Sequence, residues 1–267
     1  MTESFSLAER GDCAIVTLHR PASYNALRPE DVAALRTAVR GLEGSVRAVV
    51  ITGDGGAFCA GSEVRPGLTA LGYWAMLREW KLLVRTLRRS PLATIAAVNG
   101  LTVCGGFEMI LACDFVLVAE DAHVLDQHVK FDLHPGAGTT VALPRRIGSQ
   151  RALWHLVSGE HLAPERLVEL GLALEVCPPD ELLDRAVAVA AVVARRAPAT
   201  FASVKDCVRR SGLPLDRFLE RVACLRNTRR LGASGKEVRE RRFAENSEVV
   251  STIERGRRPG AEGRTTA

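Results

Sequence analysis

The stretches Phe58-Cys59-Ala60-Gly61 and Asn99-Gly100-Leu101-Thr102-Val103-Cys104-Gly105-Gly106-Phe107-Glu108 decide the fold of this chain. Each follows an apolar run that is typical of a buried strand, Ala48–Thr52 before the first and Ile95–Val98 before the second. A strand that ends at glycines and leads into a helix leaves backbone N–H groups without an intrahelical acceptor. Two such groups from different loops can converge on one oxygen, which is the geometry of an oxyanion hole for a carbonyl that gains negative charge.

The order of the predicted elements divides the chain of 267 residues into three parts. Strand patterns alternate with helical patterns up to about residue 178, and only helical patterns follow. This order predicts an α/β core over residues 1–195 and a helical C-terminal region over residues 196–247. Residues 248–267 are rich in Gly, Arg and Thr and poor in apolar side chains, so we expect a disordered tail there.

Composition and charge exclude several classes of protein. The net charge is +5, but the paired arginines occur without a recognisable nucleic-acid-binding module, so we expect no nucleic-acid partner. Solvated helix faces explain most of these arginines, and an acidic ligand such as a nucleotide-bearing cofactor remains the alternative. We find no apolar run of 18 residues and no secretory segment, so we expect no membrane partner.

The cysteines indicate a reducing compartment. There are seven, with no C-x-x-C pair, and several lie inside apolar runs. An odd number without a secretory segment favours a cytoplasmic protein. No Cys/His cluster has the spacing of a metal site, so we predict no metal. Cys104 lies beside the glycines but has no evident base near it in the sequence, which argues against a nucleophilic role.

Four motifs in order resemble the crotonase (enoyl-CoA hydratase/isomerase) superfamily over roughly residues 5–243. They are Asn25-Ala26-Leu27 after Arg20-Pro21, Phe58–Gly61, Ala96–Gly100 with Gly105-Gly106-Phe107-Glu108, and Pro135–Gly138. The resemblance implies an α/β spiral of ββα units, with a helical C-terminal region that makes trimer contacts in a homotrimer or hexamer. It also implies an acyl thioester substrate, usually an acyl-CoA, so that coenzyme A belongs to the substrate and no cofactor is tightly bound.

The resemblance also assigns roles to individual residues. The backbone N–H groups of Ala60 and Gly105 match the oxyanion hole of the family, with Cys104 where a first glycine often stands. Glu108 matches the first of two glutamates with which hydratases position and activate water. A partly buried carboxylate suits a general base, although a glutamate in a first helical turn can also do no more than complement the helix dipole.

The second glutamate of the hydratases is replaced. They carry it seven residues before the proline that matches Pro135, and this chain has His128 there. An imidazole can accept a proton and an imidazolium can donate one, and Asp126, Asp132 and His134 are candidates to orient it. Hydrolases of cyclic 1,3-diketones resemble the chain in this histidine, but they use an aspartate where Ala137 stands. The alternative is that His128 has no chemical role.

Two aromatic residues complete the expected site. Tyr73 and Trp74 open a helix that borders the acyl pocket in the family, although a packing role suits them as well. The resulting hypothesis is a lyase similar to enoyl-CoA hydratase, with Glu108 and His128 as catalytic residues. The alternatives are hydrolysis of a carbon–carbon bond in a 1,3-diketone and a non-catalytic member that binds acyl-CoA.

Overall fold

The computed structural model describes residues 4–63, 70–131 and 133–210. Its strands are β1 (Phe5–Arg10), β2 (Cys13–Leu18), β3 (Ala48–Gly53), β4 (Ala57–Cys59), β5 (Ala93–Val98), β6 (Leu101–Val103), β7 (Phe115–Ala119), β8 (Val124–Leu125) and β9 (Glu175–Cys177). Its helices are α1 (Pro29–Gly41), α2 (Ala70–Arg89), α3 (Gly105–Ala112), α4 (Thr139–Ile147), α5 (Ser149–Ser158), α6 (Pro164–Glu169), α7 (Leu182–Ala194) and α8 (Pro198–Arg210), with short 3-10 turns η1 (Pro21–Ser23) and η2 (His128–Phe131).

The strands form two sheets. The larger has six strands in the order β1-β2-β3-β5-β7-β9, and the smaller has three in the order β4-β6-β8. Only β1 and β2 pair antiparallel; β3, β5, β7 and β9 continue the larger sheet in parallel. Each of β3, β5 and β7 therefore leads into one strand of the smaller sheet before the chain turns to a helix. The mixed α/β class is confirmed, and the spiral arrangement stays a prediction.

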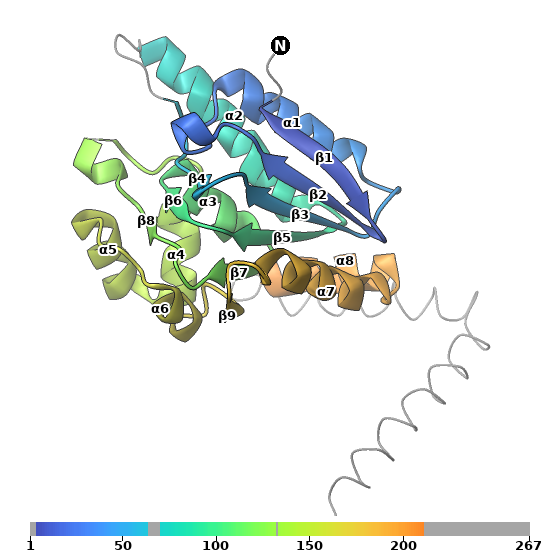
Figure 1. Cartoon of the computed structure of the whole chain (residues 1–267). Helices are drawn as coiled ribbons and strands as arrows, with labels where there is room; N and C mark the ends of the chain where they lie inside the picture. Colours follow the sequence, from blue (N-terminus) through green and yellow to red (C-terminus); the bar gives the residue numbers. More distant parts are fainter. Residues whose placement is uncertain (1–3, 64–69, 132, 211–267) are drawn as a thin grey trace, which may run out of the picture. The chain divides into compact units, whose positions relative to one another are not determined.

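Helices cover the larger sheet because its central strands are apolar on both faces. All residues of β5 are buried, and β3 is buried along its first five residues. A parallel strand of this kind needs helices on both sides. Helix α7 packs across β2, β3, β5 and β7, and Figure 1 shows α1 and α2 packed together on the other side of the sheet.

The C-terminal part of the chain is described only in part. The chain divides into two compact units, residues 1–206 and 207–267, and α8 ends at the last described residue. The predicted helical region 196–247 is thus seen as α8 alone, and the predicted disordered tail lies outside the described residues. Among the described helices, none is long and apolar enough to span a membrane alone, while α7 and α8, bent by 108°, pass that test as a pair.

A buried asparagine fastens the loop between β2 and α1 to the end of β3. The Asn25 side chain accepts a hydrogen bond from the Arg20 N–H at 2.8 Å. Its amide group donates to the carbonyls of Ala57 at 2.7 Å and Asp54 at 3.0 Å. The residue is fully buried and has a φ of 57°, a conformation that asparagine tolerates better than most residues.

We predict that Asn25→Ala lowers the free energy of unfolding by about 3 kcal/mol, because it leaves buried backbone groups without partners and strains the backbone. Chemical denaturation at fixed protein concentration measures this change. Asn25→Gly is the matched control, since glycine removes the same hydrogen bonds without the strain, and it should lose about 1 kcal/mol less. An Asn25→Ala protein as stable as the parent would contradict the prediction.

Candidate active site

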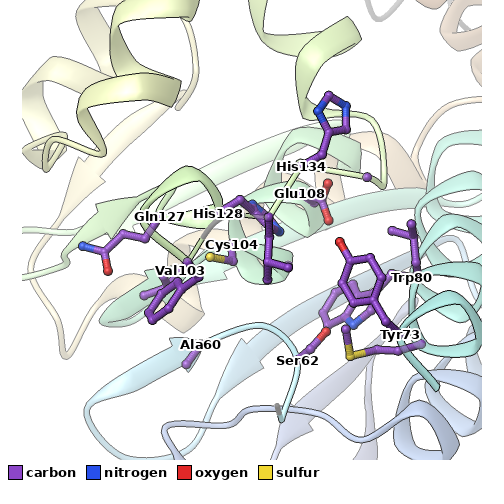
Figure 2. Close-up of a pocket in the computed structure, with 16 residues that line it drawn as sticks. Ala60, Ser62, Tyr73, Trp80, Val103, Cys104, Glu108, Gln127, His128 and His134 are labelled. Atoms are coloured by element: carbon purple, nitrogen blue, oxygen red, sulfur yellow. The ribbon is translucent and has the colours of Figure 1, made fainter. Parts of the chain in front are cut away.

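Helix α2, the loop after β4, the end of β6 with the start of α3, and the segment that follows β8 line a cavity of about 630 Å³. The predicted site residues Ala60, Tyr73, Gly105, Glu108 and His128 all line it. Apolar side chains of Met76, Leu77 and Trp80 from α2 form one wall, and Figure 2 shows Tyr73 on the same side. Most of the lining is therefore apolar, with a small set of polar groups, which is typical of a small-molecule site.

The loop after β4 packs tightly on the start of α3. A Cβ atom on Gly61 would lie 2.8 Å from the Gly105 nitrogen, and one on Gly106 would lie 2.0 Å from the Cys59 carbonyl oxygen. Side chains at these positions would push the loop and the helix apart. Gly61 also has a φ of 89°, which favours glycine. The two glycine-containing stretches are thus held together as the sequence predicts.

Gly105 supplies one free donor to the cavity. It is the first residue of α3, so its N–H has no intrahelical acceptor, and it has none among the other described residues. A carbonyl oxygen within hydrogen-bond distance of this N–H would be stabilised as it became negative. The geometry is compatible with the role that the resemblance implies for Gly105.

The structure contradicts the predicted role of Ala60. Its N–H donates to the Tyr24 carbonyl at 2.9 Å and is therefore already committed. Ser62, two residues further along the chain, offers a free donor instead. The Gly61 carbonyl accepts from the Leu27 N–H at 2.8 Å, and a trans peptide directs the Ser62 N–H to the opposite side. Ser62 lines the cavity, and its N–H has no acceptor among the described residues.

Glu108 is buried at the bottom of the cavity. Its carboxylate accepts hydrogen bonds from the Ala137 N–H at 2.6 Å and the Thr139 hydroxyl at 3.4 Å, so the Pro135–Gly138 turn holds it in place. Burial raises the pKa of Glu108 to about 6, and the nearby His128 and the Ala137 N–H partly offset this rise. A carboxylate with this pKa is suited to take and return a proton near neutral pH.

His128 is held by an aspartate that has no exposed surface. Its Nδ1 lies 2.9 Å from the Asp126 Oδ1, and its backbone N–H donates to the same oxygen at 3.0 Å. Burial alone would lower the pKa of His128, but the hydrogen bond with Asp126 and the adjacent Cys104 sulfur outweigh it and raise the pKa to about 10. Of the three predicted orienting residues, Asp126 takes this role; Asp132 lies outside the described residues, and His134 is exposed at the cavity.

Of the two predicted aromatic residues, only Tyr73 lines the cavity. Figure 2 shows its hydroxyl pointing toward Glu108. Burial, together with the charge of Glu108, raises the pKa of Tyr73. Trp74 is 62% exposed and is absent from the cavity lining, with the Lys81 ammonium 5.8 Å from its ring. Successive residues of a helix point 100° apart, so only one of this pair can face the cavity. The predicted pocket role of Trp74 is therefore wrong.

Cys104 is the neighbour that sequence reasoning missed. Its Sγ, a nitrogen of His128 and an oxygen of Asp126 all lie within 4.8 Å of one another, close enough for the three to share a metal ion. The His128 Nδ1 is already bonded to Asp126, however, so the predicted absence of a metal stays our prediction. The 23 residues between Cys104 and His128 conceal this contact, which only the pairing of β6 with β8 creates.

The cavity thus combines two free backbone donors, a buried carboxylate and a histidine paired with an aspartate in an α/β fold. Residues 9–221 match the family described as enoyl-CoA hydratase/isomerase. The chain belongs to this family. Membership supports an enzyme with a hydratase-like function, consistent with the lyase class.

Named relatives agree with the family. The chain is 36% identical over 205 residues to a putative enoyl-CoA hydratase of Thermus thermophilus, covering 74% of this chain and 81% of the relative. It is 35% identical over 194 residues to a probable enoyl-CoA hydratase of Rhodobacter capsulatus, covering 72% and 76%. Among solved structures, an enoyl-CoA hydratase from Polaromonas sp. JS666 aligns with a TM-score of 0.78 at 31% identity, covering 84% of this chain and 91% of that one.

We predict that the His128 ring stays protonated well above neutral pH. Its pKa of about 10 lies above the value of about 6.5 in an unfolded chain. The pair with Asp126 therefore stabilises the fold fully below about pH 6.5, and this contribution is lost as the pH rises through about 10. NMR titration of the His128 Cε1–H measures the pKa. Asp126→Asn should lower it, and a midpoint near 6.5 in the parent protein would contradict the prediction.

Proposed function

We propose that this protein is a hydratase-type enzyme that adds water across the double bond of an enoyl thioester, with coenzyme A as the carrier. The observation that carries the proposal is that two backbone N–H groups without an acceptor in the described part of the chain, those of Ser62 and Gly105, belong to residues that line a cavity with Glu108 and His128. The thioester carbonyl would sit between the two donors. Each can be worth roughly 3 kcal/mol when the oxygen becomes enolate-like.

The buried carboxylate and the histidine have complementary proton affinities. Glu108 as carboxylate takes a proton from water while the water oxygen bonds to the β-carbon of the substrate. Electrons move onto the thioester oxygen, and the His128 imidazolium then donates a proton to the α-carbon. The cycle ends with the proton on Glu108 passing to solvent and His128 regaining one. Asp126 keeps the ring charged and oriented for this step.

We also propose that the protein is a homotrimer or hexamer in the cytoplasm. Membership in the family favours a homotrimer or hexamer, and several large apolar side chains are exposed on η2, α4 and α5, namely Val129, Phe131, Val141, Leu153, Trp154 and Val157. Such side chains are typical of surfaces that a second chain covers. The free cysteines among the described residues agree with a cytoplasmic setting.

A second candidate function has one specific observation in its favour. The Asp126–His128 pair can activate a water molecule, as hydrolysis of a carbon–carbon bond in a cyclic 1,3-diketone requires. The same backbone donors would then hold the enolate that the cleavage releases. A non-catalytic protein that binds acyl-CoA is the third candidate, which the replaced second glutamate keeps open.

We expect Glu108→Gln to lower the rate of enoyl-CoA hydration about 100-fold or more, because an amide cannot accept the proton of water. Mass spectrometry in ¹⁸O-labelled water, with a panel of enoyl-CoAs and cyclic 1,3-diketones, identifies the product. His128→Glu restores the second carboxylate and should increase hydration. The exposed Glu120→Gln serves as the control and should leave the rate unchanged.

The products also separate the three candidates. A labelled hydrate that depends on Glu108 supports the hydratase. A ring-opened labelled acid that disappears when His128 is changed would replace it with the diketone hydrolase. Binding of coenzyme A thioesters without any product would favour the non-catalytic protein.

The pH profile gives a separate test. Hydration requires Glu108 ionised and His128 protonated, so the rate should fall as the pH drops through about 6 and fall again as it rises through about 10. Initial rates of hydration across this range measure both limbs. In Glu108→Gln the residual rate should lose the acid limb, and an unchanged acid limb in that variant would assign it to another group.

A further inference from the structure

The proposed site contains a thiol that hydration does not use. Cys104 lines the cavity, and Figure 2 shows it beside His128. Its Sγ is within 4.8 Å of both a His128 nitrogen and an Asp126 oxygen. A thiol beside a histidine that is itself oriented by a carboxylate has the arrangement of groups that nucleophilic catalysis by cysteine requires.

The backbone positions this thiol next to the proposed oxyanion hole. Cys104 directly precedes Gly105, which lines the cavity and whose N–H has no acceptor among the described residues. Cys104 has a φ of 50°, a conformation that residues other than Gly, Asn and Asp rarely adopt. In nucleophile elbows a strained residue carries the nucleophile between a strand and a helix, and the N–H of the following residue binds the oxyanion. The turn from β6 through Cys104 into α3 has the same order of parts.

The aspartate behind the histidine has an oxygen left over. Asp126 is fully buried; its Oδ1 is bonded to His128, and its Oδ2 has no hydrogen-bond partner among the described residues. A buried carboxylate in this position favours a cationic neighbour. The same three side chains could instead bind zinc, but the 2.9 Å contact between the His128 Nδ1 and the Asp126 Oδ1 already pairs two of them with each other. The contacts therefore favour an Asp–His pair that serves a thiolate.

We propose that Cys104 is a nucleophile that accepts the acyl group of the thioester, so that the cavity also hydrolyses saturated acyl-CoAs. The proposal rests on the acyl thioester substrate of the proposed function. The Sγ thiolate attacks the carbonyl carbon, and the oxyanion is held by the N–H groups of Gly105 and Ser62. The bond from carbon to the coenzyme A sulfur then breaks, and His128 donates its proton to the departing thiolate. Water, deprotonated by Glu108, attacks the acyl carbon, and the bond from carbon to the Cys104 sulfur breaks to release a carboxylic acid and the Cys104 thiolate. The proton on Glu108 then passes to His128 through solvent, which restores the starting state.

A saturated substrate isolates this reaction from hydration. Butanoyl-CoA has no double bond, so release of coenzyme A from it, followed by chromatography, reports thioester cleavage alone. Intact-mass spectrometry after an acid quench should show one butanoyl group on the protein, and peptide mapping should locate it on Cys104. But-2-enoyl-CoA is assayed in parallel for hydration.

Three variants test the assignment. Cys104→Gly suits the positive φ at this position and should abolish both the adduct and the release of coenzyme A from butanoyl-CoA. Cys104→Ser should lower the release about 100-fold, and Asp126→Asn should lower it to a similar extent. Cys177→Ala, in β9 and absent from the cavity lining, is the control and should behave as the parent.

The outcomes separate this proposal from the proposed function. Hydration of but-2-enoyl-CoA without adduct or cleavage of butanoyl-CoA would overturn the nucleophile and leave the hydratase. Cleavage that survives Cys104→Gly would also overturn it. Bound zinc in the purified protein, with cleavage lost on chelation, would make the cluster a metal site instead. Failure of both substrates would overturn both proposals.

Discussion

The close approach between the loop after β4 and the first turn of α3 is the constraint on which the site depends. Gly61 and Gly106 lie so near the opposite backbone that a Cβ atom at either position would force the two apart. This contact brings the N–H groups of Ser62 and Gly105 to one cavity. It also fixes where α3 begins, and the helix in turn positions Glu108 over the same space, one turn further on.

The polar groups of the site are held by partners that are themselves buried. Glu108 is bonded to the turn that begins at Pro135, and His128 is bonded to Asp126, which has no exposed surface. Neither the Glu108 carboxylate nor the Asp126 carboxylate can rotate without losing a hydrogen bond in a buried environment. The polar groups of the cavity are thus held in fixed positions, which is the condition under which backbone donors stabilise developing charge most effectively.

The loop after β4 shows why the sequence could predict an oxyanion hole without identifying both of its N–H donors. The glycines indicate that the two stretches lie close together, because a tight backbone contact excludes larger residues at these positions. Which N–H remains free depends on the partners that the rest of the chain supplies. The Tyr24 carbonyl accepts from the Ala60 N–H, whereas the isolated bridge between Leu27 and Ser62 uses the Gly61 carbonyl and the Glu63 N–H and leaves the Ser62 N–H without an acceptor among the described residues. Trp74 illustrates the same limit, since a residue-by-residue resemblance does not set the rotation of a helix.

The sequence by itself determined the α/β class, the family, the cavity between the two glycine-containing stretches, and the positions of Gly105, Glu108 and His128 within it. These follow from local patterns, because buried strands, glycines at close contacts and helix starts each leave a mark on neighbouring residues. The tertiary structure alone decided that Ser62 replaces Ala60 as the free donor and that Cys104 meets His128. It also selected Asp126 among the candidates to orient that ring. These contacts join residues on different strands and turns, and their geometry depends on the register of the small sheet rather than on any short stretch of chain.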